Sequence, residues 1–238
     1  FGDLRVQLLK PFHNSSYVLG TDANGRDILT RLAYGGRVSM TVAGLSLLFT
    51  LVIGGAVGSI AGFFGGLIDS ILMRLVDVVI SIPGITLLLI LSVLWKPGPT
   101  GLALVIAAIS WTGISRLIRG EVLTLKHRDY IDAARIIGAT DRRIIMNHIF
   151  PNVVSIIIVW ASLALPSLII TEATLSYLGF GVQIPTPSWG NMLNEASQFY
   201  TQSWTYAFLP GFMIFLAALS FNLVGNGLRD ALDPRLNN

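Results

Sequence analysis

The chain has 238 residues, of which 53% are hydrophobic and only 12% are charged, with a formal net charge of +3. Its mean hydropathy is +0.70. Soluble domains carry about 25% charged residues, so this composition leaves too little polar surface for a soluble protein of this length. The basic residues lie beside apolar segments, which is typical of membrane proteins, and we expect no nucleic-acid partner. Cysteine is absent, which excludes a disulfide framework, a thiolate metal site and a cysteine nucleophile.

Several uncharged apolar stretches are long enough to cross a bilayer as helices, which takes roughly 20 residues each. The expected spans are residues 38–63, 74–95, 101–118, 152–172 and 206–226. Their apolar runs are unbroken and do not alternate with polar residues, which favours helices over barrel strands. The sequence therefore predicts an all-α polytopic membrane protein with five transmembrane helices in a domain covering 38–228.

The orientation of these spans follows from the basic residues between them. The loop 119–150 is rich in Lys and Arg, whereas the loop 173–205 contains neither. The positive-inside rule then predicts that 119–150 is cytoplasmic and 173–205 is external. Because each span crosses the membrane once, counting the spans places residues 1–37 outside or at the interface and the tail 229–238 in the cytoplasm. Because no signal peptide is visible, we expect a sixth, N-terminal span before Phe1.

The loop 119–150 has helical composition, and its glycine and cap residues predict two short helices with a turn at Gly138. Two apolar stripes are expected on them: Tyr130, Ala134, Ile137 and Gly138 on one helix, and Ile144, Ile145, His148 and Ile149 on the other. Stripes with nothing of their own to bury against indicate a partner surface. A helix pair lying on lipid headgroups is the alternative.

Small residues recur every four positions near the first span, at Gly54, Gly58, Gly62 and Gly66. This spacing predicts a groove along one helix face that lets another helix approach closely. The second helix belongs either to this chain or to a partner subunit.

The expected external segments carry turn-forming and charged residues. In residues 20–37, Asp22 or Asp27 could pair with Arg26 or Arg31, or the segment could be a solvated charged turn. Within the loop 173–205, the stretch 177–191 is stiffened by glycines and prolines around Trp189; the candidates are Gly179, Gly181, Pro185, Pro187, Trp189 and Gly190. Trp189 is expected either to lie at the lipid interface or to contact an external solute-binding protein.

Inside the spans, Pro83 with Gly84 predicts a kink, and Arg74 with Asp77 has the spacing of an ion pair on one helix. Glu172 is placed at the outer end of the fourth span, so no ionisable residue is expected in the middle of a span. This pattern argues against proton coupling.

The chain also lacks the motifs of an enzyme. None of its lysines follows a phosphate-binding glycine loop, and no serine-hydrolase elbow or zinc-protease motif is present. Its three histidines are scattered, so no metal site is expected. We therefore expect no cofactor bound by this chain, and a stand-alone secondary transporter or channel is the main alternative to a subunit driven by a separate ATPase.

Four segments, in order along nearly the whole chain, carry a resemblance. Residues 132–151 resemble the E-A-A…G…I-x-L-P loop of bacterial ABC importer permeases, with Asp132 in place of Glu. Residues 20–37 (GTDANGRDILTRLAYGGR), 173–193 (ATLSYLGFGVQIPTPSWGNML) and 221–234 (FNLVGNGLRDALDP) are similar to segments of the dipeptide, oligopeptide and nickel subfamily. The second of these has Tyr177 where Phe is usual and the third has Asn226 where Asp is usual.

The resemblance implies the ABC importer permease fold and the C-type subunit of a heterodimeric pair in the bacterial cytoplasmic (inner) membrane, carrying peptides or similar small solutes. It implies a homologous second permease, two cytoplasmic P-loop ATPases that hold ATP and Mg²⁺, an extracytoplasmic solute-binding protein and surrounding lipid as partners. It also implies that the loop couples to the ATPases through Tyr130, Asp132, Ala133, Ala134, Gly138, Ala139 and Pro151.

Overall fold

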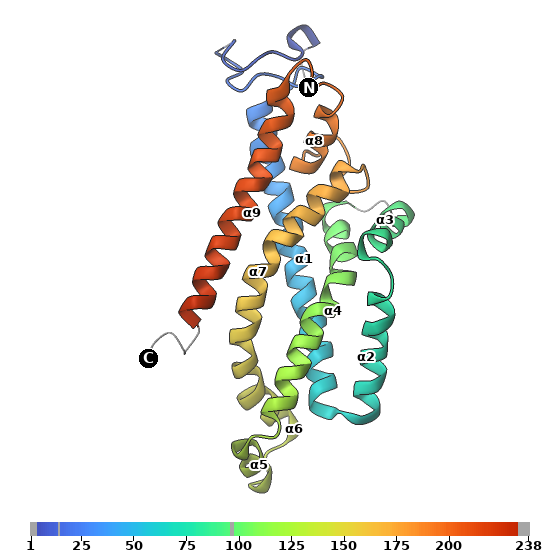
Figure 1. Ribbon diagram of the computed structural model, residues 1–238, viewed down its shortest axis with the longest axis vertical. Helices are drawn as coiled ribbons and strands as arrows, with labels where there is room; N and C mark the ends of the chain where they lie inside the picture. The colour runs from blue at the N-terminus through green and yellow to red at the C-terminus, as the bar shows by residue number, and fades with distance from the viewer. Residues whose placement is uncertain (1–3, 14, 96–97, 233–238) are drawn as a thin grey trace. The chain divides into compact units, whose positions relative to one another are not determined.

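The computed structural model describes residues 4–13, 15–95 and 98–232. Most of the expected tail, residues 233–238, and with it the C-terminus, lies outside the described residues. The described part contains no strand, only an isolated bridge between Thr21 and Asp27. The helices are α1 (Ile28–Phe64), α2 (Gly66–Ile80), α3 (Gly84–Trp95), α4 (Pro99–Leu125), α5 (Asp129–Ile136), α6 (Asp141–Ile144), α7 (Phe150–Tyr177), α8 (Trp189–Ala196) and α9 (Trp204–Leu232), with short 3₁₀ and π-helical turns at Leu4–Val6 and Ile145–Ile149 (Figure 1).

The expected spans correspond to helices that are long and apolar enough to cross a membrane. Four are continuous, namely Ile28–Phe64, Pro99–Leu125, Asp141–Tyr177 and Trp204–Ala231. The pair α2 and α3, bent by 85°, makes a fifth when the two helices are counted as one broken span. The helices extend beyond the apolar runs; α1, for example, begins at Ile28 rather than at residue 38. The backbone of charged residues can continue the helical hydrogen bonds beyond an apolar run. The apolar runs therefore mark only the middle of these helices.

The bend between α2 and α3 confirms the kink expected at Pro83 and Gly84. The helix α2 ends at Ile80 and α3 begins at Gly84. Proline has no N–H to donate and its ring clashes with the preceding turn, which ends the first helix. By contrast, α7 and α9 continue through Pro166 and Pro210.

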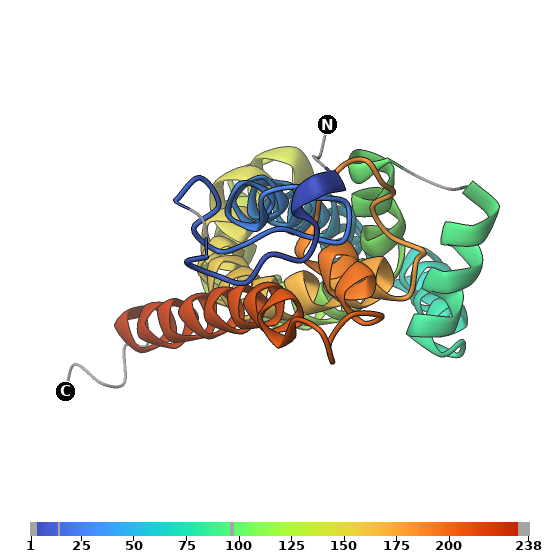
Figure 2. The same ribbon diagram turned by 90° about the horizontal axis from the view of Figure 1, so that it is seen from above.

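The described residues within 4–46, 88–106 and 165–222 form one compact unit, called here the first unit. Its core joins the start of α1, the short helix α8 and the start of α9; the buried members are Ile28, Leu32, Trp189, Met192, Ala196 and Tyr206. The N-terminal segment crosses over the start of α1 (Figure 2). It is held there by backbone bonds, such as that from the N–H of Ile28 to the carbonyl of Gly20 at 3.1 Å.

Residues 47–87, 107–164 and 223–232 form the second unit. Its core joins the end of α1, α4, α5, α6 and the start of α7; the buried members are Phe63, Ile114, Ile118, Val122, Leu125, Ile131, Ile144, Ile149 and Val153. The helices α5 and α6 lie beyond the end of α4 (Figure 1). They are therefore part of a packed core and not a free loop.

The glycine stripe packs α1 against α4 within the second unit. A Cβ on Gly58 would overlap the carbonyl oxygen of Ser115, and one on Gly62 would lie 2.9 Å from the carbonyl oxygen of Arg119. Gly54 is equally close to Trp111. These contacts support packing within the chain. The expectation for Gly66 is wrong, because α1 ends at Phe64 and Gly66 begins α2 with open space around it.

Replacing Gly58 with alanine is therefore expected to destabilise the protein by about 1–3 kcal/mol, as overpacking of a close contact does. The matched control is Gly44→Ala on the same helix, where a Cβ meets nothing within 4 Å. That change should be neutral or slightly stabilising, since alanine is the better helix former. Thermal unfolding in detergent compares the two, and equal midpoints for both variants would contradict the packing assignment.

Candidate functional site

The segment between α4 and α7 forms two short helices, and we call residues 126–149 the α5–α6 hairpin. Gly138 adopts a φ of +85°, in the left-handed region that favours glycine. Its N–H donates to the carbonyl of Arg135 at 2.9 Å, which closes the end of α5. Thr140 then caps α6 by accepting from the N–H of Arg143 at 3.4 Å. These features confirm the predicted helix pair and its turn at Gly138.

One side of the hairpin is buried in the second unit. Ile131 of α5 and Ile144 of α6 are fully buried, and Ile149 nearly so. The expectation that Ile144, Ile145, His148 and Ile149 form a free stripe is therefore wrong. The sequence shows the helical period of these residues but not the elements of the same chain that cover them. Their burial holds the hairpin firmly on the end of α4.

The other side of the hairpin is bare and apolar. Ile136 and Ile137 are 86% and 85% exposed, at the tip beside Gly138. A hollow of about 400 Å³ opens next to them, and it is lined by Tyr130, Ala133, Ala134, Ile137, Gly138, Ala139, Arg143 and His148. Exposed large aliphatic residues at the tip of a packed hairpin indicate a contact surface.

The structure brings together most of the residues that the sequence singled out here. Tyr130, Ala133, Ala134, Gly138 and Ala139 line the hollow. Two others lie apart from the lining: Asp132 is exposed and pairs with Arg135 at 3.5 Å, and Pro151 is the second residue of α7. Phe150 separates Pro151 from the π-helical turn Ile145–Ile149.

The first unit contains a polar site, a cluster of two arginines and two carboxylates that we call the ionic cluster. Arg31 donates to Asp22 at 2.5 Å and to Glu195 at 2.6 Å and 3.1 Å. Arg26 donates to the same two carboxylates at 2.6 Å and 2.7 Å, and the hydroxyl of Tyr206 donates to Glu195 at 3.0 Å. The formal charges cancel, so the cluster can be buried without a large net charge.

The ionic cluster confirms the expected pairing of Asp22 with Arg26 and Arg31. Asp27 instead caps α1 by accepting from the N–H of Thr30 at 2.9 Å. Sequence reasoning missed Glu195 and Tyr206, since no local pattern connects a residue of α8 or α9 with the N-terminal segment. The cluster joins the N-terminal segment to α1, α8 and α9.

Trp189 is buried, with only 5% of its surface exposed. Its indole N–H donates to the carbonyl of Leu32 at 2.9 Å and its backbone N–H to the hydroxyl of Ser39 at 3.2 Å. Both interpretations of this side chain, as a lipid anchor or as an external contact, are therefore wrong. It is a packing residue between α8 and α1.

The other residues of this loop divide by exposure. Gly181 and Gly190 are buried, and a Cβ on Gly190 would overlap the backbone of Ala173. Pro187 is half-buried, whereas Gly179 and Pro185 are exposed. Helix α8 itself was not expected, although Ser188 and Asn191 form the capping box that signals its start.

Several ionisable side chains in the long helices are paired or buried. Asp77 pairs with Arg116 of α4 at 2.5 Å, so the expected pair of Arg74 with Asp77 is wrong. Asp69 pairs with Arg119 through two hydrogen bonds of 2.5 Å and 2.6 Å. Glu172 is fully buried within α7, which continues to Tyr177, and accepts from the hydroxyl of Ser176 at 2.7 Å. The expectation that it lies at the outer end of the span stays a prediction, since the bounds of a helix do not mark the membrane boundary.

A polytopic helical chain with a packed hairpin between two spans fits a transporter subunit that is driven by a separate protein subunit. Residues 54–238 match the family described as the binding-protein-dependent transport system inner membrane component. The chain belongs to this family.

Several characterised relatives are similar over most of their length. The chain is 38% identical to the oligopeptide transport system permease protein OppC of Haemophilus influenzae, over 98% of this chain and 75% of the relative. It is 42% identical to the glutathione transport system permease protein GsiD of Pectobacterium atrosepticum, over 94% and 74%. It is 39% identical to the dipeptide transport system permease protein DppC of Bacillus subtilis, over 98% and 72%.

Solved structures share the fold. A chain of the inward-facing MetNI methionine ABC transporter superposes with a TM-score of 0.67 at 20% identity, covering 87% of this chain and 98% of that one. An amino acid ABC transporter gives a TM-score of 0.63 at 14% identity, with coverages of 83% and 92%.

The family defines the chain as a multi-pass membrane permease subunit of an ABC importer. Such a subunit is not an enzyme; ATP is hydrolysed by separate ATPase subunits, and the importer also contains a permease partner. The assignment favours this function over a stand-alone transporter or channel.

Proposed function

We propose that the chain forms half of the translocation pathway of an importer for peptides or similar small solutes, and that the α5–α6 hairpin couples it to the ATPases. The solute class rests on the names of the relatives, which are permeases for oligopeptides, dipeptides and glutathione. The coupling role rests on the geometry of the hairpin.

The single observation that carries the coupling role is the two-sided character of the hairpin. Ile131 and Ile144 fix one side in the core of the second unit, while Ile136 and Ile137 on the other side are almost fully exposed. Exposed isoleucines are a hydrophobic contact that an ATPase groove would bury. Because the hairpin is packed onto α4, a push on its tip would be transmitted to a membrane-spanning helix rather than absorbed by a flexible loop.

The full assembly that we propose has two homologous permeases, two cytoplasmic P-loop ATPases that hold ATP and Mg²⁺, and an extracytoplasmic solute-binding protein. In this arrangement the hairpin and the C-terminal tail are cytoplasmic, and the segment from Tyr177 to Trp204, with α8, faces outside. Among the candidates named from the sequence, Gly179 and Pro185 are exposed and therefore available to the binding protein. Closure of the ATPases would move the hairpins and switch the pathway from inward-facing to outward-facing.

Single cysteines test this orientation and the partner together, because the native chain contains no cysteine. In inverted vesicles stripped of the ATPase, Ile137→Cys should react with a membrane-impermeant maleimide, whereas in intact cells it should not. With the ATPase bound, a short bifunctional reagent should link it to that subunit. Tyr200→Cys, which is also highly exposed, is the matched control and should react in intact cells without linking to the ATPase. Labelling of both positions from the same side would contradict the topology.

A further inference from the structure

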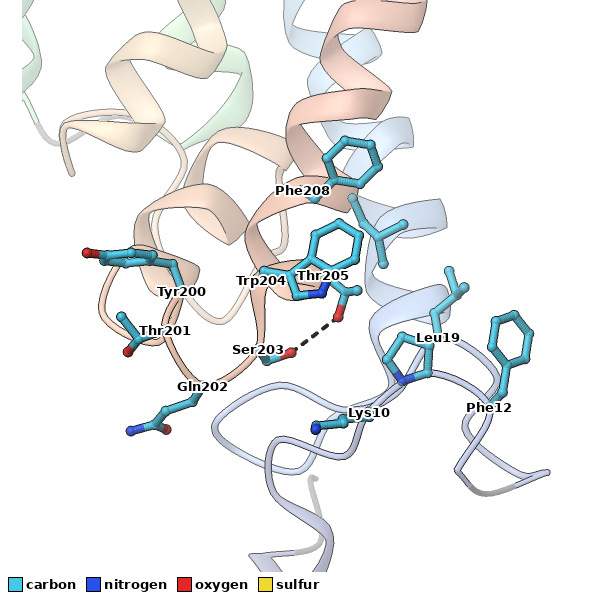
Figure 3. Close-up of a pocket in the computed structure, with 12 residues that line it drawn as sticks. Lys10, Phe12, Leu19, Tyr200, Thr201, Gln202, Ser203, Trp204, Thr205 and Phe208 are labelled. Atoms are coloured by element: carbon cyan, nitrogen blue, oxygen red, sulfur yellow. Dashed lines mark hydrogen bonds between the residues drawn. The ribbon is translucent and has the colours of Figure 1, made fainter.

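A hollow of about 720 Å³ lies in the first unit beside the start of α9 (Figure 3). One wall comes from the N-terminal segment, with Lys10, Phe12 and Leu19, and the other from residues 200–209. None of the contacts that define the ionic cluster or the hairpin involves this hollow. It is therefore a separate feature of the molecule.

The lining is polar at one end and apolar at the other. Lys10 is exposed and takes part in none of the ion pairs found in the described part of the chain, and Thr201, Gln202 and Ser203 lie along the same rim. The apolar end holds Trp204 and Phe208. Phe12, 81% exposed, leaves a further bare aromatic surface at this site.

The apolar end continues along the outside of α9 as a row of aromatic rings. The ring centroids of Trp204 and Phe208 are 5.5 Å apart, those of Phe208 and Phe212 5.4 Å, and those of Phe212 and Phe215 6.4 Å. Each of these side chains is exposed. Only 6% of the most apolar window of this membrane-spanning helix is buried within the chain, so the row has hydrocarbon or another protein as its neighbour.

We propose that the hollow binds an anionic phospholipid, with its phosphate against Lys10 and an acyl chain along the row from Trp204 to Phe215. A phospholipid has both of the required parts: a negative headgroup for a lysine and polar rim, and a long apolar tail for a continuous apolar face. Tryptophan and lysine are the residues that occupy the boundary between headgroups and acyl chains. A soluble peptide would match the rim but would leave the row of rings exposed.

The test uses the complete importer, reconstituted in nanodiscs of phosphatidylcholine with or without phosphatidylglycerol. The photoreactive residue p-benzoylphenylalanine replaces Phe208, and the cross-linked product is identified by mass. Phosphatidylglycerol should be captured in preference to phosphatidylcholine. Lys10→Gln should lower its capture about fivefold, the contribution of one lysine beside anionic lipid, and should leave phosphatidylcholine capture unchanged.

The matched control places the same photoreactive residue at Val78 of α2, which is exposed on another helix and belongs to neither the hollow nor the row of rings. Lipid capture there should not depend on Lys10. The proposal is overturned if Phe208 is linked to another protein subunit instead of lipid, or if Lys10→Gln leaves phosphatidylglycerol capture at Phe208 unchanged or lowers it equally at both positions. None of these readouts depends on transport or on the coupling role of the hairpin.

Discussion

Replacing Arg31 with alanine is expected to destabilise the protein by about 3–5 kcal/mol, the cost of leaving a buried charge without its partner. Arg31 is only 6% exposed and bonds both Asp22 and Glu195. Its loss leaves two carboxylates facing each other with Arg26 as their remaining cation. We expect the N-terminal segment and α8 to loosen first, because the cluster joins them.

The measurement is thermal or denaturant unfolding in detergent, with Arg37→Ala as the matched control. Arg37 lies on the same helix but is exposed, so its loss should change stability by less than about 1 kcal/mol. Combining Arg31→Ala with Glu195→Gln should recover part of the loss, since the second change removes one unpaired charge. If Arg31→Ala and Arg37→Ala unfold at the same point, the ionic cluster does not stabilise the fold.

Replacing both Ile136 and Ile137 with glutamate is expected to abolish transport while leaving the permease folded. Burial of an isoleucine contributes about 1.5–3 kcal/mol, so losing two should weaken ATPase docking by about a hundredfold or more. Both side chains are exposed, so charge at these positions costs little in the free subunit. Solute uptake and solute-stimulated ATP hydrolysis by the reconstituted importer provide the readouts.

The control for this double variant is Gln198→Glu, which places a negative charge on an exposed residue of the expected external loop. It should leave ATP hydrolysis unchanged. Wild-type solute-stimulated hydrolysis in the Ile136 and Ile137 variant would show that the hairpin tip is not the coupling contact.

The parts of this fold that could be predicted from sequence are those governed by local chemistry. The long apolar runs predict spans because a bilayer excludes unpaired backbone groups, and Gly138 followed by Thr140 predicts a helix end and a new start. Asp22 and Arg26 are four residues apart, which brings them within reach of each other in a turn.

The remaining features depend on contacts between distant segments. Glu195 is 164 residues from Arg31, and Asp77 pairs with Arg116 on another helix rather than with Arg74. Whether Ile144 or Ile137 faces a partner depends on which side of the hairpin α4 covers. Helical periodicity does not predict which side that is. Trp189 has the composition of an interface residue, yet the close approach of α8 to α1 buries it.

The most direct test of the central claim is to purify the tagged chain in mild detergent from cells that express its neighbouring genes, and to identify the co-purifying proteins by mass. The wild-type chain should retain a second permease and P-loop ATPases. The Ile136 and Ile137 double variant should retain the permease but lose the ATPases. Recovery of the wild-type chain alone, stable and without any ATPase, or equal retention of the ATPases by the variant, would contradict the account.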